Sequence, residues 1–203
     1  MILDLSGQTS VVSCGGVPVV SKILLHAREE EIQILCMNAL AAMSFGIHKS
    51  IDENSKLIRN TGALAFMRQL FTSENSSEIH QDALYAIETI CHNNVELQGE
   101  MLCQLLDVIS TWAVETEETL WTNVFDLFLP WLSSSDPPQL SRNEVKILFN
   151  ILELPELLPS VSRSIEKLLC SILDTSEDVE DLVVLIDISR FRDVPLSLRI
   201  LEK

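Results

Sequence analysis

Apolar residues recur along the chain in one arrangement that appears four times. The spacing of apolar positions over residues 32–43 returns over residues 79–90, 120–131 and 161–172, in steps of 47, 41 and 41 residues. Within each segment the apolar positions follow the i, i+4, i+7 and i+11 pattern of one face of a helix. Helical units of this length bury that face by stacking on the next unit. The pattern therefore predicts an all-α repeat protein that forms a single domain over residues 1–203.

Turn residues between these helices mark where the repeat units begin and end. Gly15-Gly16 followed by Pro18 predicts the start of a helix, and Gly62 predicts another. Pro130 is predicted to end or kink the helix that contains it. The turn-rich stretch over residues 133–138 predicts a long connector, with a hinge as the alternative. The expected repeat units are approximately residues 15–46, 52–93, 99–132, 141–173 and an incomplete 176–203.

Residues 54–71 resemble the first two helices of an armadillo repeat. The likeness rests mainly on Thr61-Gly62-Ala63-Leu64 and on the apolar residues around it. Ala39 and Ala86 match the small residue at which the third helices of neighbouring armadillo repeats press together. The resemblance is specific over roughly residues 10–95, and the rest resembles α-solenoids in general. It implies an all-α, right-handed α-solenoid of about four to five armadillo/HEAT-like repeats, with three helices per unit.

The resemblance also implies that the third helices line a concave groove that binds extended peptides or helical partners. In this register the partner-binding residues are predicted to be Asn38, Gln81, Tyr85, Glu88, Thr89, His92, Thr122 and Asp126. The groove is expected to be acidic in its middle and basic near Arg163 and Lys167. Importin-alpha proteins repeat a tryptophan and an asparagine on these helices, and this chain does not. Binding of nuclear-import signals in the importin-alpha manner is therefore not expected.

The chain is strongly acidic, with 30 Asp and Glu against 14 Lys and Arg and a formal net charge of −16. Part of this acidity has an ordinary cause, because carboxylates near a helix start, such as Glu29, Glu30 and Glu31, offset the helix dipole. The absence of any Lys or Arg between Arg68 and Arg142 nonetheless favours a protein or peptide partner of basic character. A field of this sign disfavours nucleic acid and anionic membrane surfaces.

The reactive residue types of the chain form no recognisable catalytic or metal motif. The five cysteines are widely spread, and Cys36, Cys91 and Cys103 lie in apolar helical stretches, as expected of reduced core residues. His80 and His92 lack the close pairing of zinc-ligand motifs. We find no phosphate-binding glycine loop and no nucleophile motif. The sequence predicts a protein that is not an enzyme and that uses no cofactor or metal.

The compartment is predicted from the start of the chain and from its cysteines. Residues Met1 to Leu5 lack the positive charge and sustained apolar run of a signal peptide. No stretch approaches the ~20 apolar residues that a membrane-spanning helix needs. Reduced cysteines in the core favour a reducing compartment. A cytoplasmic location is expected, with the nucleus as the alternative.

Three functional hypotheses remain open at this point. The leading one is a non-catalytic adaptor or scaffold that binds a basic protein partner through the concave groove. The alternative is a regulatory armadillo-like segment of a larger enzyme, of the kinase or pseudokinase type, whose catalytic domain is absent from this chain. The third follows from apolar residues at both ends, which lack the polar cap of a solenoid terminus. Such ends favour self-association or contact with a neighbouring domain.

Overall fold

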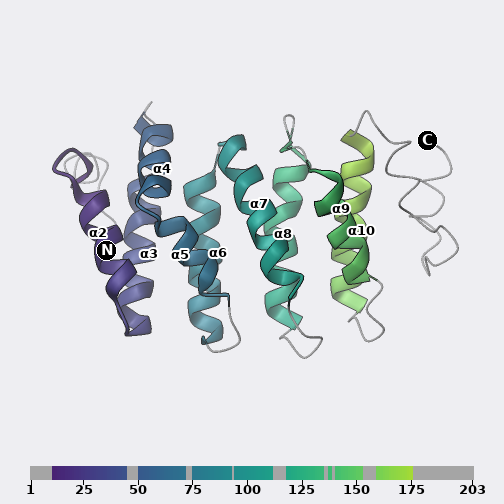
Figure 1. The fold of residues 1–203 in the computed structure, drawn as a ribbon, viewed down its shortest axis with the longest axis horizontal. Helices are drawn as coiled ribbons and strands as arrows, with labels where there is room; N and C mark the ends of the chain where they lie inside the picture. The colour runs from purple at the N-terminus through teal and green to yellow at the C-terminus, as the bar shows by residue number, and fades with distance from the viewer. Residues whose placement is uncertain are drawn as a thin grey trace, which may run out of the picture. The chain divides into compact units, whose positions relative to one another are not determined.

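The computed structural model describes residues 11–44, 50–71, 75–92, 94–111, 118–134, 137–138, 140–152 and 159–175. Within these ranges all regular structure is α-helical (Figure 1). The predicted all-α class is confirmed. The predicted repeat unit at residues 176–203 lies outside the described residues.

The chain divides into two compact units, unit 1 at residues 1–94 and unit 2 at residues 95–203. Unit 1 contains α2 (Gly16–His26), α3 (Glu30–Ser44), α4 (Ser50–Asn60), α5 (Ala63–Gln69) and α6 (Ser77–Cys91). Unit 2 contains α7 (Val95–Ile109), α8 (Glu118–Leu132), α9 (Arg142–Leu152) and α10 (Pro159–Thr175). That the two units form a single domain stays a prediction. None of the described helices is both long enough and apolar enough to cross a membrane.

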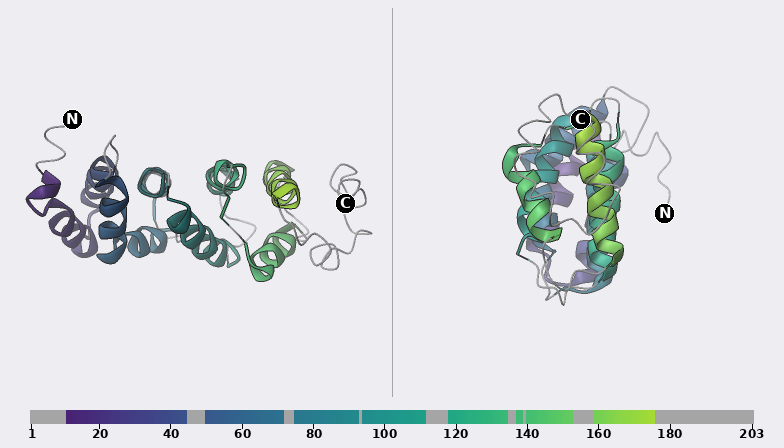
Figure 2. Two further views of the ribbon diagram at one scale, coloured as in Figure 1. Left: turned by 90° about the horizontal axis from the view of Figure 1, so that it is seen from above. Right: turned by 90° about the vertical axis from the view of Figure 1, so that its right-hand side faces the viewer.

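Unit 1 consists, in its described residues, of one helix pair followed by one three-helix repeat. α2 packs against α3, and α4, α5 and α6 follow in the order predicted for an armadillo repeat. α3 lies along α6, and α2 and α3 form one end of the unit (Figure 2). Gly15 and Gly62 precede α2 and α5 with left-handed φ angles of 78° and 81°. Both predicted helix starts are therefore confirmed, and each rests on a conformation that favours glycine.

Replacing Gly62 by alanine should lower the free energy of unfolding by about 1 kcal/mol, because an L residue is strained at a left-handed φ. An added Cβ would meet no heavy atom within 4 Å, so the loss comes from the backbone alone. Urea denaturation followed by circular dichroism measures the change. Gly62→Asn should lose less, because asparagine tolerates this conformation. An equal loss in both variants would contradict the backbone explanation.

The repeated apolar helices of the sequence are α3, α6, α8 and α10. In α6, α8 and α10 every apolar position of the repeat is buried, which confirms that the pattern marks the core. α3 departs from this pattern at two positions. Ile32 is 40% exposed and Ala39 is half-buried, whereas their equivalents, Ile79 and Ala86, are 0% exposed. The covering of the repeated face is thus complete in α6 and incomplete in α3.

α4 connects to the last helices of both repeats of unit 1 through buried polar side chains. Asn54 Nδ2 donates a hydrogen bond to the carbonyl oxygen of Met43 at 3.0 Å, and Ser55 Oγ donates one to the carbonyl oxygen of Ile90 at 2.7 Å. Met43 and Ile90 lie in the last turns of α3 and α6, where backbone carbonyls have no partner within the helix. The two side chains therefore supply donors to the C-terminal ends of both helices.

Unit 2 contains two helix pairs in its described residues, α7 with α8 and α9 with α10. α8 carries a row of buried aromatic side chains. Its Trp121 and Phe125 rings stack with centroids 6.0 Å apart, and Phe125 meets Phe128 edge to face at 6.1 Å. These three side chains are at most 2% exposed, so they form the densest aromatic part of the core. Pro130 lies in the last turn of α8, which ends at Leu132.

The cysteines predicted to lie in the core are covered to different degrees. Cys36 and Cys91 are buried, whereas Cys103 of α7 is half-buried. Burial, together with a hydrogen bond to the carboxylate of Glu144 in α9, raises the pKa of Cys103 to about 12. This thiol therefore stays protonated near neutral pH and acts as a packing group.

Candidate partner-binding surface

α3 and α6 carry matching sets of exposed or half-buried residues. Four positions of α3, spaced three or four residues apart, lie 47 residues before four positions of α6. Residues at this spacing lie on the same side of a helix. They define the α3–α6 face, which consists of Glu31, Leu35, Asn38 and Ala42 of α3 and Glu78, Asp82, Tyr85 and Thr89 of α6.

A side-chain hydrogen bond joins the two helices within this face. Asn38 Nδ2 donates to Asp82 Oδ1 at 2.9 Å. Because Asp82 and Tyr85 are three residues apart on α6, the bond fixes Asn38 close to the turn that carries Tyr85. Tyr85 itself is 57% exposed, so its ring is available for contact.

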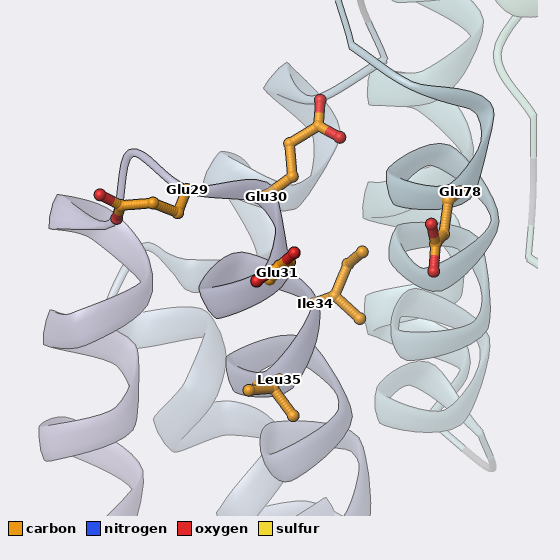
Figure 3. Close-up of a pocket in the computed structure, with 6 residues that line it drawn as sticks. All are labelled: Glu29, Glu30, Glu31, Ile34, Leu35 and Glu78. Carbon is orange, nitrogen blue, oxygen red and sulfur yellow. The ribbon is translucent and has the colours of Figure 1, made fainter.

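The α3–α6 face begins in an acidic hollow near the N-terminal ends of both helices (Figure 3). The hollow has a volume of about 630 Å³ and is lined by Glu29, Glu30, Glu31, Ile34, Leu35 and Glu78. Ile34 lies between Glu31 and Glu78, and Leu35 is 68% exposed (Figure 3). The hollow therefore combines carboxylates with apolar surface, which suits the apolar stem and charged head of a lysine or arginine.

Glu30 fixes one edge of the hollow by linking the start of α3 to the start of α6. Its carboxylate accepts hydrogen bonds from the Ser76 hydroxyl at 2.5 Å and the Ser76 N–H at 3.2 Å. These bonds hold the pKa of Glu30 below its usual value, so the carboxylate stays charged. Ser76 is also the N-cap of α6, where its hydroxyl accepts from the N–H of Ile79 at 3.4 Å. One serine thus caps a helix and positions an acidic side chain.

Three of the predicted partner-binding residues belong to the α3–α6 face. They are Asn38, Tyr85 and Thr89, and the bond to Asp82 brings Asn38 to α6. The Thr89 hydroxyl donates to the Tyr85 carbonyl oxygen at 2.8 Å, so it can offer a partner only an acceptor. Tyr85 and the carboxylate of Asp82 are therefore the stronger contact groups in this part of the face.

The remaining predicted residues lie outside the α3–α6 face. Gln81 and Glu88 are exposed on α6, four and three residues from Tyr85, so they flank the face on the side of that ring. His92 is the exposed C-cap residue of α6. Thr122 and Asp126 belong to α8 of unit 2, where Thr122 is half-buried and Asp126 is exposed. A binding role stays a prediction for all eight predicted residues.

Sequence reasoning missed the acidic and apolar residues at the N-terminal part of the face. Glu31 and Glu78 occupy equivalent positions of α3 and α6, as do Leu35 and Asp82. The same 47-residue step pairs Asn38 with Tyr85. Applied to the positions one and two helical turns before Asn38, it pairs Leu35 with Asp82 and Glu31 with Glu78. The hollow itself could not be predicted, because it depends on how close α3 and α6 lie.

No family model and no curated protein sequence matches the chain. Solved structures do match it. An engineered protein is 20% identical, with a TM-score of 0.61, over 97% of this chain and 82% of its own. A designed armadillo repeat protein in complex with the peptide (KR)4 is 14% identical, with a TM-score of 0.60, over 97% of this chain and 85% of its own. A second designed armadillo repeat protein is 14% identical, with a TM-score of 0.58, over 97% and 84%. Likeness at these identities describes the fold alone.

Proposed function

Because the chain has an armadillo-like helical repeat fold, we propose that it is a non-catalytic binding module that takes a basic segment of a protein partner on the α3–α6 face. The observation that carries this proposal is the acidic hollow, in which two helices contribute carboxylates beside exposed apolar surface. The function is that of an adaptor or scaffold, and it requires no chemistry from the chain.

The arrangement of the carboxylates favours an extended cationic peptide over a metal ion. Glu31 and Glu78 occupy equivalent positions on neighbouring helices, so a peptide that crosses both helices passes one carboxylate on each. Packed helices lie about 9 Å apart, which an extended chain spans in about three residues. Among the described residues no group of three or more His, Cys, Asp or Glu could hold a metal ion. Lys or Arg side chains two to three positions apart fit this spacing.

The exposed apolar residues of the face add contact area to the charge. Leu35 is 68% exposed beside the hollow, and Tyr85 is 57% exposed further along the face. Lys and Arg pack their alkyl stems on such surface, and the face of a tyrosine ring attracts their charged heads. Tyrosine is also enriched at the energetically important centres of interfaces. These two residues give the proposed site an affinity that charge alone would not supply.

The likeness to a designed armadillo repeat protein supports this choice of partner. The structure of that protein is of its complex with (KR)4, a peptide of alternating lysine and arginine. At 14% identity its binding residues do not transfer to this chain. Its ligand nevertheless has the chemistry that the acidic hollow favours, so (KR)4 is a suitable first probe.

The test is a titration of the chain into fluorescently labelled (KR)4, followed by fluorescence anisotropy at low salt, where charge interactions are least screened. Glu31→Lys/Glu78→Lys should weaken binding by about tenfold, because each change replaces an attraction by a repulsion worth up to about 1 kcal/mol. The matched control is Glu53→Lys/Asp107→Lys, which makes the same change in net charge at exposed positions of α4 and α7.

A loss confined to the Glu31 and Glu78 variant supports the hollow as the site. Equal losses in both double variants would mean that only the overall acidity of the chain attracts the peptide, and would overturn the proposal. Circular dichroism spectra that match the unmodified chain ensure that either loss reflects binding and not unfolding.

A further inference from the structure

Unit 1 exposes an unusual amount of aliphatic surface on its first two helices. Val19 is 59% exposed and Ile23 is 48% exposed on α2, and Ile32 is 40% exposed on α3. Val19 and Ile23 are four residues apart, so they lie on one side of α2. Together these three residues define the end face of unit 1.

The repeat itself shows what this kind of surface is built to meet. Residues 47 positions further on are covered more fully. Leu70, the equivalent of Ile23, is 5% exposed, Ile79, the equivalent of Ile32, is 0% exposed, and Phe66, the equivalent of Val19, is half-buried. In that repeat α5 packs on α2, and α6 packs on α3. The helices α5 and α6 of the second repeat are therefore covered by their counterparts in the first. The same positions in α2 and α3 have the shape and chemistry of a surface that a layer of helices covers.

We propose that the end face binds the end face of a second copy of this chain, so that two molecules form a closed dimer around a twofold axis. In such a dimer α2 of one copy lies against α3 of the other, and the reverse contact is identical. The aliphatic residues of both copies then form a continuous layer, as they do between the repeats within unit 1.

Charge at the rim of the end face favours pairing of like surfaces. The exposed charged side chain of α2 next to Ile23 is the cation Lys22, whereas the exposed charged side chain of α3 next to Ile32 is the anion Glu31. When α2 of one copy meets α3 of the other, Lys22 of each copy lies near Glu31 of the other copy. The dimer therefore contains two such pairs of opposite charges. The end face is therefore complementary to itself, as a twofold interface requires.

Net charge disfavours the other way of stacking two copies. Unit 1 contains 10 acidic and 6 basic residues, whereas unit 2 contains 20 acidic and 8 basic residues. A head-to-tail chain of molecules would oppose unit 1 to the more strongly negative unit 2 at every contact. Contact between two copies of unit 1 brings together the less charged parts of the molecule, so repulsion is smaller.

The size of the end face indicates a weak dimer. α3 has 15 residues, which corresponds to a length of about 22 Å, and two helices side by side are about 20 Å wide. The projected area is then about 450 Å² per copy, at the low end of specific interfaces. We therefore expect dissociation in the micromolar range, where dimer and monomer interconvert as the protein is diluted.

The experiment is sedimentation equilibrium of the full chain from about 5 to about 500 µM, a range that brackets a micromolar interface. The unmodified chain should approach twice its 22.8 kDa mass and no more. Ile23→Glu/Ile32→Glu should raise the dimer dissociation constant at least about tenfold, because it places charges in the apolar contact. The control is Leu57→Glu on α4, a leucine that is 37% exposed and that belongs to neither of the two helices of the end face.

A dimer that is lost in the double variant and kept in the control supports the proposal. A monomer at every concentration, a dimer that resists the double variant, or a mass that keeps growing would each overturn it. If the chain is a monomer at every concentration, the end face is left to another occupant, such as residues 1–10 or a helical repeat of a different protein. Glu31 belongs both to the acidic hollow and to the rim of the end face, whereas Ile23 and Ile32 do not line the hollow. Binding of (KR)4 is therefore measured in Ile23→Glu/Ile32→Glu as well, so failure of either proposal leaves the other distinguishable.

Discussion

Phe125→Ala should unfold unit 2 at a urea concentration about 2 M lower than the unmodified chain. Phe125 is 1% exposed and contacts the rings of both Trp121 and Phe128. Its removal takes a buried ring from the centre of the aromatic row and leaves a cavity. Such changes cost about 3–5 kcal/mol, and urea unfolds small domains with slopes of about 1–3 kcal/mol per molar.

Tryptophan fluorescence measures this effect in the part of the chain where it arises. All three tryptophans of the sequence lie in residues 95–203, so their emission reports on unit 2 alone. Asp126→Ala is the control within the same helix, because it removes an exposed side chain next to Phe125. We expect it to change the free energy of unfolding by no more than about 0.5 kcal/mol. Similar losses in the two variants would mean that the aromatic row does not anchor the core of unit 2.

Asn54→Ala/Ser55→Ala should lower the free energy of unfolding by about 2–4 kcal/mol. Each side chain is buried and donates to a carbonyl at the end of a different helix, Met43 in α3 and Ile90 in α6. Removing the donors leaves two buried carbonyl oxygens without these partners, and each such loss costs about 1–3 kcal/mol. Each single variant should account for about 1–2 kcal/mol of this loss, because the two side chains have separate acceptors.

Ser110→Ala is the control for the serine part of this prediction. The Ser110 hydroxyl also donates to a backbone carbonyl, that of Asp107 at 2.7 Å, but this bond is exposed to water. Its loss should change stability by no more than about 0.5 kcal/mol. Urea denaturation followed by circular dichroism compares the two serines directly. If Ser55→Ala costs no more than Ser110→Ala, burial of the bond contributes nothing and the explanation is wrong.

The helices and the core could be predicted from the sequence because local signals carry them. Gly15 and Gly62 mark helix starts through a backbone conformation that glycine adopts most readily. The repeated apolar positions identify the buried sides of α6, α8 and α10 because each helix turns its periodic face toward its neighbours.

The parts that could not be predicted depend on which helices are neighbours. Ile32 carries the same apolar signal as Ile79, yet its exposure differs because α6 packs on the repeat that precedes it, whereas the described residues include no repeat before α3. The donors Asn54 and Ser55 resemble ordinary surface residues in the sequence, because their acceptors are backbone atoms of distant helices. The acidic hollow likewise requires α3 and α6 to stand side by side.

The bonds from α4 also determine which kinds of sequence change the repeat can absorb. Their acceptors are backbone oxygens, which every amino acid provides, so the side chains of Met43 and Ile90 can be exchanged without removing an acceptor. Inserting or deleting one residue near the end of α3 or α6 is different, because it turns the terminal carbonyls by about 100° around the helix axis. Lineages of this repeat should therefore exchange one apolar side chain for another at these two buried positions while keeping the helix lengths fixed.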